Sequence, residues 1–370
     1  MDLPTYAFQR QRYWLNPTTG SRAEDLGMGA AAHPLLGAAV TLPASGGLML
    51  TGRLSLAGQP WLADHVVAGR VVVPGTALIE MVVRAGDEAG CGRVEELLIE
   101  TPLVLPDEGG LRVQVTVDEP EESGRRVVGI YTQPENAVTA QWTRHAAGVL
   151  TPVDVDGSAK DPVDGDLSLW PPADATTVDL SGFYTELAVR GLVYGPAFQG
   201  TRAAWRRGEE LFAEIALAQG TEVSGFGVHP ALLDAALHVM GLTADGGELM
   251  LPFAWTDVVV HASGAVAARV LVAPSRSGEG VSVMLADGTG ELIASVGSLV
   301  LRSVSAQAVT AGSDSASDGL FGVEWVAAPA EAAAVGVGSG GWVVVGEVGG
   351  LDLPGVVSFA DLGGLVGAVE

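Results

Sequence analysis

Two segments of this 370-residue chain are predicted to be helices that are apolar on most of their faces, and they constrain the fold more than any other feature. The first spans residues 74–89 and the second residues 230–240. Each opens with proline, which a helix start tolerates, and each is followed by glycine. A helix without a broad polar face is poorly suited to a protein surface. We therefore expect each helix to be wrapped by a sheet.

The segments that flank these helices have the pattern of β-strands. Leu111–Val117 alternates apolar and polar residues, which is the period of a strand with one buried face. Residues 281–296 hold two such runs separated by a turn at Ala286–Gly290, as in a hairpin. The expected fold is α+β: a curled antiparallel sheet around a buried helix, built twice. The other strand-rich runs are residues 94–105, 137–150, 211–217 and 266–272.

Three stretches of different composition divide the chain. Residues 1–30 are polar and irregular, with no sustained period. Residues 151–178 mix proline and glycine with six aspartates, and residues 306–318 are rich in Ser, Ala, Gly and Asp, which is typical of loops. The predicted domains are therefore a first strand-and-helix half at 31–150 and a second at 179–305, joined by the linker at 151–178.

Composition excludes several classes of function. The chain has 19 Lys and Arg against 44 Asp and Glu, and its net charge of −25 repels nucleic acids and anionic membrane surfaces. The single cysteine, Cys91, excludes an internal disulfide and a cysteine-based zinc cluster, and it suits a small buried residue better than a nucleophile. The sequence has neither a leader nor an apolar run approaching ~18 residues. We expect a soluble, cytoplasmic protein.

His65 is the first candidate catalytic residue, because it lies among apolar residues just before the first helix. A neutral imidazole in a dry pocket is a competent general base near neutral pH. Gly69 allows a tight turn. The helix start at Pro74 and Gly75 brings backbone N–H groups close, with no Cβ on Gly75 to block a thioester carbonyl. The alternative is a core histidine whose nitrogens bond to the backbone.

Asp234 is the second candidate, one turn into the second helix and surrounded by Leu and Ala. Burial there is expected to raise the pKa of its carboxyl, as a proton donor to a leaving hydroxyl requires. His238, four residues on, lies on the same helical face and can orient that carboxyl. A buried cap or ion-pair partner is an equally good interpretation of Asp234 alone. A metal site of Asp234, His238 and His229 has too few ligands at familiar spacings, so no metal is predicted.

Two further segments carry aromatic residues in turn-rich surroundings. In the first, Tyr194 could present its hydroxyl to a substrate, beside a bend fixed by Gly195 and Pro196. The alternative is a tight loop that packs Tyr194 and Phe198 into the core. The second segment, Leu251–Trp255, is interpreted as a structural wall. Neither segment identifies a function by itself.

Together these segments resemble the dehydratase domains of type I modular polyketide synthases. Four motifs of that family occur in order over about 190 residues, and their co-occurrence is far more specific than any one of them. The start of the family's domain is similar to His33–Gly37. The four motifs are HxxxGxxxxP at His65, Gly69 and Pro74, YGPxF at Tyr194, Gly195, Pro196 and Phe198, DxxxQ/H at Asp234 and His238, and LPFxW at Leu251–Trp255.

The resemblance implies a double hotdog fold, with the active site where the two halves meet. It implies dehydration of a 3-hydroxyacyl thioester, held on the phosphopantetheine of an acyl carrier protein, to the α,β-unsaturated thioester, with no cofactor or metal in the domain. His65 is the expected base and Asp234 the expected acid. The expected partners are the carrier protein, neighbouring synthase domains and a second copy in a homodimer. The residues expected to support the pair are His238, Tyr194, Gly75, Pro74, Gly69 and Gly195.

The flanking residues resemble other parts of the same assembly line. Leu3–Trp14 is similar to the linker that follows an acyltransferase domain, so residues 1–30 are predicted to be that linker and the chain to be part of a longer polypeptide. Residues 320–325 and 341–350 resemble the first strands of the structural half of a ketoreductase. Residues 306–370 are therefore predicted to be a linker and the start of that subdomain.

Three other functions remain open on the same fold: a double-bond isomerase, a pyran-forming cyclase and a catalytically idle scaffold. Relatives that shift double bonds tend to lose the aspartate or the motif proline. This chain has both Asp234 and Pro74, which favours ordinary dehydration. The complete set of motifs disfavours the idle scaffold.

Overall fold

The computed structural model describes residues 23–136, 141–152, 165–242 and 249–304, and the backbone of two short strands beyond them. The chain divides into two compact units, Met1–Ser315 and Ala316–Glu370. The described residues of the second unit form a parallel pair of strands, β18 (Val343–Val345) and β19 (Val357–Phe359).

Part of the predicted domain plan falls outside these residues. Two segments with a predicted identity lie outside the described residues. They are Leu3–Trp14, which resembles the linker after an acyltransferase, and residues 320–325, which resemble the first strand of a ketoreductase. Their identities, like the other domain boundaries, stay predictions.

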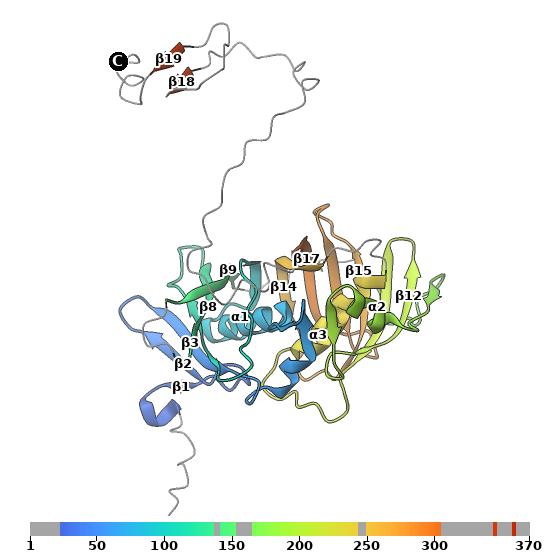
Figure 1. The fold of residues 1–370 in the computed structure, drawn as a ribbon, viewed down its shortest axis with the longest axis horizontal. Helices are drawn as coiled ribbons and strands as arrows, with labels where there is room; N and C mark the ends of the chain where they lie inside the picture. Colours follow the sequence, from blue (N-terminus) through green and yellow to red (C-terminus); the bar gives the residue numbers. More distant parts are fainter. Residues whose placement is uncertain are drawn as a thin grey trace, which may run out of the picture. The chain divides into compact units, whose positions relative to one another are not determined.

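The first unit is built on one sheet of fourteen strands, in which the two predicted halves follow one another (Figure 1). The first half contributes its strands in the order β1-β2-β3-β7-β8-β9-β6, each antiparallel to its neighbours. Their bounds are Gly29–Ala30 for β1, Ala38–Leu42 for β2, Gly47–Leu54 for β3, Arg93–Ile99 for β6, Leu111–Val117 for β7, Arg126–Pro134 for β8 and Thr143–Thr151 for β9.

The second half continues the sheet in the order β14-β17-β16-β15-β13-β12-β10, again antiparallel throughout. Strands β6 and β14 are hydrogen-bonded to each other, so the two halves share one continuous sheet. The bounds are Thr176–Val178 for β10, Thr201–Arg207 for β12, Glu210–Ala216 for β13, Met250–Val260 for β14, Ala267–Pro274 for β15, Val281–Ala286 for β16 and Leu292–Ser303 for β17.

Each half curls around one apolar helix, as predicted (Figure 1). Helix α1 (Gly75–Ala89) lies among the strands of the first half, and α3 (Pro230–His238), all of whose residues are buried, among those of the second. The two helices contact each other. The remaining helices are short: α2 is Phe183–Val189, and the 3-10 turns are η1 (Ala23–Leu26), η2 (Pro60–Asp64) and η3 (Val239–Leu242).

The predicted strand at 94–105 ends early, and this difference shapes the interior. Strand β6 stops at Ile99, and the residues after it leave the sheet. Pro102 lacks the N–H that a ladder needs, which accounts for the end of the strand. Ile99 and the residues that follow instead line a cavity inside the first unit.

A second, three-stranded sheet also joins the halves. It has the order β11-β4-β5, with β4 (His65–Val67) and β5 (Arg70–Val71) from the first half and β11 (Leu192–Tyr194) from the second. In its register Tyr194 lies opposite His65. Two motifs that are distant in the sequence are therefore neighbours in the fold.

Candidate active site

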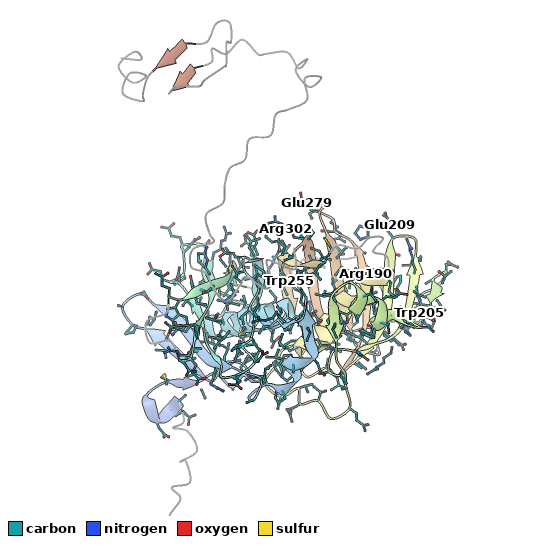
Figure 2. The ribbon with its side chains drawn as sticks, in the orientation of Figure 1. Arg190, Trp205, Glu209, Trp255, Glu279 and Arg302 are labelled. Atoms are coloured by element: carbon teal, nitrogen blue, oxygen red, sulfur yellow. The ribbon has the colours of Figure 1, made fainter. Side chains whose placement is uncertain are left out.

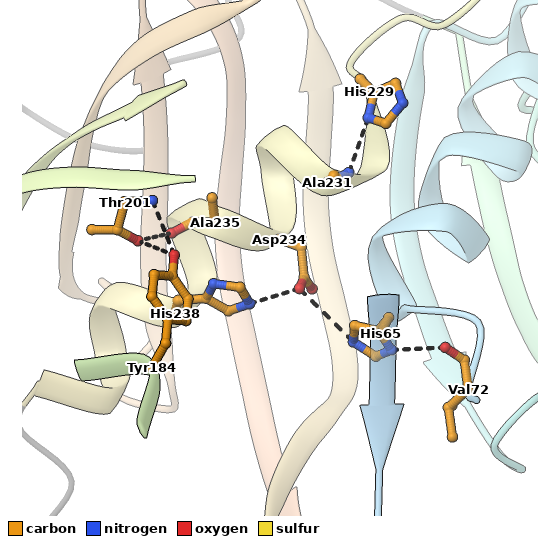
Figure 3. Close-up of polar contacts among 9 residues, drawn as sticks. All are labelled: His65, Val72, Tyr184, Thr201, His229, Ala231, Asp234, Ala235 and His238. Atoms are coloured by element: carbon orange, nitrogen blue, oxygen red, sulfur yellow. Dashed lines mark hydrogen bonds and ion pairs between the residues drawn. The ribbon is translucent and has the colours of Figure 1, made fainter. Parts of the chain in front are cut away.

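His65 opens β4 and is almost fully buried, with 5% of its surface exposed. After it, Gly69 takes a φ of 79°, a left-handed conformation that suits glycine, and the chain reverses into β5. The Nδ1 atom of His65 lies 2.7 Å from the carbonyl oxygen of Val72 (Figure 3). Because a carbonyl only accepts, Nδ1 carries the proton and Nε2 is the basic nitrogen.

Asp234 comes from α3 in the other half and faces the same space (Figure 3). It is 6% exposed. Its Oδ2 atom lies 3.8 Å from Nε2 of His65 and accepts a hydrogen bond from Nε2 of His238 at 2.8 Å. The structure therefore brings His65, from the segment before the first helix, to the two side chains that the sequence analysis singled out on the second helix.

The pKa of Asp234 differs from the expectation. Burial lowers the pKa of His65, and the nearby Asp234 carboxylate offsets only part of that effect. Burial also acts to raise the pKa of Asp234, but the charge and hydrogen bond of His238, together with His65, outweigh it and leave this pKa below its usual value. The predicted net rise in the pKa of Asp234 is therefore wrong: burial acts in the predicted direction, but the two imidazoles favour the carboxylate more strongly.

Tyr194 packs against both histidines of the site. Its ring centroid lies 3.9 Å from that of His238 and 5.5 Å from that of His65. Burial raises the pKa of Tyr194 well above the ordinary tyrosine value. Its hydroxyl therefore stays protonated and can donate a hydrogen bond into the cavity that the residue lines. Phe198 of the same segment is fully buried in the core, 5.1 Å from the His65 ring.

Other residues of the motifs act through the backbone. Pro74 occupies the N-cap position of α1 without a capping hydrogen bond from its side chain. The N–H of Gly75, the first helical residue, lies at the cavity wall and has no intrahelical partner. A Cβ on Gly75 would lie 3.1 Å from Ile99 and 3.2 Å from Pro252. The glycine thus lets these two walls lie close to the helix start. Gly195 forms the bend after β11.

The site opens into a cavity of about 330 Å³ that both halves line. Most of its walls are apolar, and its charged residues besides the central pair are Glu100, Arg190 and Arg302. The segment predicted as a wall does line the cavity, through Leu251–Phe253. Trp255 of the same strand, labelled in Figure 2, is fully buried. The guanidinium of Arg302 stacks over Phe253 at 3.4 Å from the ring centroid.

His229 is not part of the site. Its Nδ1 accepts the N–H of Ala231 and so caps α3 (Figure 3), and its ring packs 5.0 Å from Trp61 and 4.7 Å from Phe226. Burial lowers its pKa to about 4. Within the described ranges, no three or more His, Cys, Asp and Glu side chains gather in a way that could hold a metal ion. No helix in those ranges is long and apolar enough to cross a membrane.

The sequence analysis missed the wall formed by α2 and the turn after it. Leu187, Arg190 and Leu192 line the cavity there. The available signal was the spacing of Phe183 and Leu187, which are both buried and lie four residues apart. A helix of seven residues has only about two turns, which is too short for its apolar period to stand out.

Comparison with known proteins shows which proteins this chain resembles. A family model described as "Polyketide synthase dehydratase domain" matches residues 33–133, and one described as "Polyketide synthase dehydratase N-terminal domain" matches residues 162–311. The chain is also similar to polyketide synthase GfsA of Streptomyces halstedii, with 51% identity over 356 residues. That match covers 93% of this chain but 5% of the relative, so the chain spans a small fraction of the longer protein.

Solved structures show the same likeness. The dehydratase domain from the terminal module of the rifamycin polyketide synthase is 48% identical, with a TM-score of 0.70 over 76% of this chain and 99% of that one. The bifunctional dehydratase-cyclase domain in ambruticin biosynthesis is 41% identical, with a TM-score of 0.67 over 75% of this chain and 99% of that one. These likenesses confirm the predicted double hotdog fold.

Proposed function

Because this chain belongs to the polyketide synthase dehydratase domains, we propose that it removes water from a 3-hydroxyacyl thioester held on the phosphopantetheine of an acyl carrier protein. The product is the α,β-unsaturated thioester of a growing polyketide. The observation that carries this proposal is the distance of 3.8 Å between Nε2 of His65 and Oδ2 of Asp234, inside a mostly apolar cavity lined by both halves. A base and an acid this close can act on adjacent carbons of one substrate.

The chemistry consists of two proton transfers. Nε2 of His65 takes a proton from C2, next to the thioester carbonyl, and the electron pair of that C–H bond forms the C2=C3 double bond. The C3–O bond breaks, and the hydroxyl takes a proton from Asp234 and leaves as water. In this proposal the N–H of Gly75, which begins α1 at the cavity, donates to the carbonyl oxygen while negative charge develops there.

The elimination leaves the number of protons on the pair unchanged. His65 ends with the proton from C2, and Asp234 ends without its own. A transfer between them across the gap of 3.8 Å restores the starting state. The active form therefore holds one proton on the pair, and the pKa values of these coupled groups describe the pair jointly. Because the pKa of each group is lowered, a rise in pH removes that proton readily.

The supporting residues have separate parts in this proposal. His238 donates to Asp234 and orients the carboxyl, and Tyr194 offers its protonated hydroxyl to the substrate. Gly69 and Pro74 shape the backbone between the base and the start of α1. The reaction is redox-neutral and each step is assigned to a side chain or a backbone N–H, so the proposal includes no cofactor or metal.

The partners follow from the family. We propose that the acyl carrier protein delivers the substrate, that neighbouring synthase domains flank this one in a cytoplasmic enzyme, and that the domain forms a homodimer. Relatives such as GfsA are far longer than this chain, which supports flanking domains.

Ordinary dehydration is favoured over the other activities of this fold. Asp234 and Pro74 are both present at the cavity, which argues against a double-bond isomerase. The close pair of His65 and Asp234 argues against an idle scaffold. The ambruticin domain is described as a dehydratase-cyclase. The activity assay must therefore also detect a cyclised product.

The decisive experiment compares His65→Phe and Asp234→Asn with the native protein. Each is incubated with a 3-hydroxyacyl carrier-protein thioester, and loss of water is followed by mass spectrometry. We expect dehydration in the native protein and none in either variant. Asp166→Asn is the matched control, because Asp166 is an exposed carboxylate outside the cavity lining that accepts the N–H of Ser168. This variant should keep full turnover.

Three results would overturn the proposal. Full turnover in either site variant would show that the pair is not catalytic. Native protein that leaves every stereoisomer of the substrate unreacted would favour the idle scaffold, and a cyclised product would assign the domain to the cyclases.

A further inference from the structure

Two acidic side chains of the first half bind backbone N–H groups of the second half, and neither takes part in the proposed reaction. They are Asp64, which ends η2 directly before His65, and Glu80, which is buried on α1. Acidic side chains seldom stay buried or enclosed without partners that satisfy them. Both here are satisfied across the junction between the halves.

Asp64 holds the bend that carries Tyr194. Its backbone carbonyl accepts the N–H of Gly195 at 2.8 Å, and its Oδ2 atom accepts the N–H of Ala197 at 2.8 Å. A Cβ on Gly195 would overlap the Asp64 carboxyl group, so the bend lies directly on that side chain. Together with the pairing of Tyr194 and His65, these contacts fix the bend to the strand of the base.

Glu80 holds the segment that leads into α3. Its Oε1 atom accepts the N–H of Gly227 at 2.6 Å, and Oε2 accepts the N–H of Val228 at 3.1 Å. The next residue is His229, the cap of the helix that carries Asp234. Both carboxylate oxygens are thus engaged by the segment that sets where α3 begins, and hydrogen bonds to a charged acceptor are strong.

His33 supports Glu80 from the other side. Its Nδ1 accepts the N–H of Leu35, so its Nε2 carries the proton, and Nε2 lies 3.5 Å from Oε1 of Glu80. The segment His33–Gly37, which the sequence analysis identified as similar to a domain start, therefore begins beside this second contact between the halves.

We propose that Asp64 and Glu80 are positioning residues that set the distance between His65 and Asp234 by fixing the second half against the first. The proposal rests on the elimination chemistry described above. The base and the acid come from different halves, so their separation depends on contacts across the junction. Misplacing a reacting group by 1 Å can lower a rate by about 100-fold, and side-chain contacts at these two points are well placed to prevent it.

Asp64 gives the sharper test, because one of its carboxylate oxygens makes the bond. Asparagine keeps an oxygen that can accept the N–H of Ala197, whereas alanine does not. We expect Asp64→Ala to lower kcat about 10- to 100-fold with little change in KM for the carrier-protein substrate. Asp64→Asn should restore kcat to within about threefold of the native value, because the bond and not the charge fixes the bend.

Glu80 is tested with Glu80→Gln. The glutamine amide keeps the shape but turns an NH₂ group toward one of the two backbone N–H groups. We expect kcat to fall by about tenfold. Glu88→Gln is the matched control on the same helix, because Glu88 is exposed and pairs with Arg84 rather than with the second half. It should keep the native kcat.

A second readout does not depend on catalysis. The Asp234 carboxylate raises the pKa of His65, so moving it away should lower that pKa further. Titration of the His65 ring by NMR, without substrate, should show this drop in Asp64→Ala and Glu80→Gln but not in Asp64→Asn or Glu88→Gln. If Asp64→Ala does not fold, Glu80→Gln and its control decide the question alone.

The outcomes separate this proposal from the proposed function. Folded Asp64→Ala and Glu80→Gln proteins with native kcat and a native His65 pKa would overturn the positioning role. The proposed dehydratase function would still stand in that case, provided that the His65→Phe and Asp234→Asn variants are inactive. Asp64→Asn as slow as Asp64→Ala would overturn the assignment of the Asp64 bond. Active His65→Phe would instead reject the function on which the proposal rests.

Discussion

The ring of Tyr194 packs against the imidazole of His238, with 3.9 Å between the centroids and 44° between the planes. The contact crosses from β11 to the end of α3. His238 is the residue that donates to Asp234, so the tyrosine ring holds in place the group that holds the acid. Tyr194 thus contributes through its ring as well as through its hydroxyl.

Substitutions at Tyr194 should separate these two contributions. Tyr194→Phe keeps the ring and removes one hydrogen-bond donor, so we expect kcat/KM to fall by about tenfold with an unchanged Tm. Tyr194→Ala also frees His238, and we expect a further loss in kcat. Steady-state kinetics and thermal unfolding of both variants would check this. Equal losses in the two variants would mean that the ring contact has no part in catalysis.

The reaction should slow as the pH rises. The active pair needs one proton, and the pKa of His65 lies below its ordinary value of 6.5 while that of Asp234 lies below 3.8. The proton is therefore lost as pH increases through the acid range, and kcat/KM should fall by about tenfold per pH unit on the alkaline side. A pH profile of kcat/KM for a 3-hydroxyacyl carrier-protein thioester would measure it. A profile that rises between pH 6 and pH 8 would contradict the one-proton pair.

His229 should make the fold sensitive to acid. Its pKa is about 4 in the folded protein and about 6.5 in an unfolded chain. The unfolded state therefore binds the proton first, and the stability that His229 contributes above pH 6.5 is lost as the pH falls toward 4, by about 3 kcal/mol at most. His229→Asn keeps a helix-capping oxygen without a titrating ring. Urea unfolding at several pH values should show that the free energy of unfolding falls less steeply with acid in this variant than in the native protein. The same pH dependence in both proteins would exclude His229 as the cause.

Two glycines should differ in their tolerance of a methyl group. Gly195→Ala places a Cβ into the Asp64 carboxyl group, and such overpacking costs about 1–3 kcal/mol. In Gly69→Ala the added Cβ contacts no neighbouring atom. The cost comes from the φ of 79°, a left-handed conformation that lowers the free energy of unfolding of an alanine variant by about 1 kcal/mol. Denaturant unfolding of both variants would give the comparison. The opposite order would mean that the bend at Gly195 yields easily.

The sequence predicted those elements whose side chains have a clear period or a clear boundary. Strand β7 was predicted with its observed bounds, Leu111–Val117, because one of its faces is buried and the other is not. Helix α3 was recognised by its apolar residues and its opening proline, although it passes into a 3-10 turn after His238. These signals are local, so one sequence is enough to read them.

The remaining parts depend on contacts between distant segments. Strand β4 has three residues and β11 has three, too few for any alternation to appear. In the described structure β11 pairs with β4, which also pairs with β5. The pKa of Asp234 depends on imidazoles from both halves, so burial alone predicted the wrong direction. The sequence analysis did not predict a role for Asp64 or Glu80. In the sequence, Asp64 is an acidic residue beside a histidine and Glu80 is an acidic residue on a helix, and neither pattern indicates a contact with the other half.

The pairing of β6 with β14 also bears on how the protein can be divided. A fragment that ended between the halves would leave one of these strands with an open row of amide and carbonyl groups. Such an edge readily recruits another chain. Each half therefore shields the other from self-association, and truncation at the middle of the domain should yield insoluble material rather than a smaller folded unit.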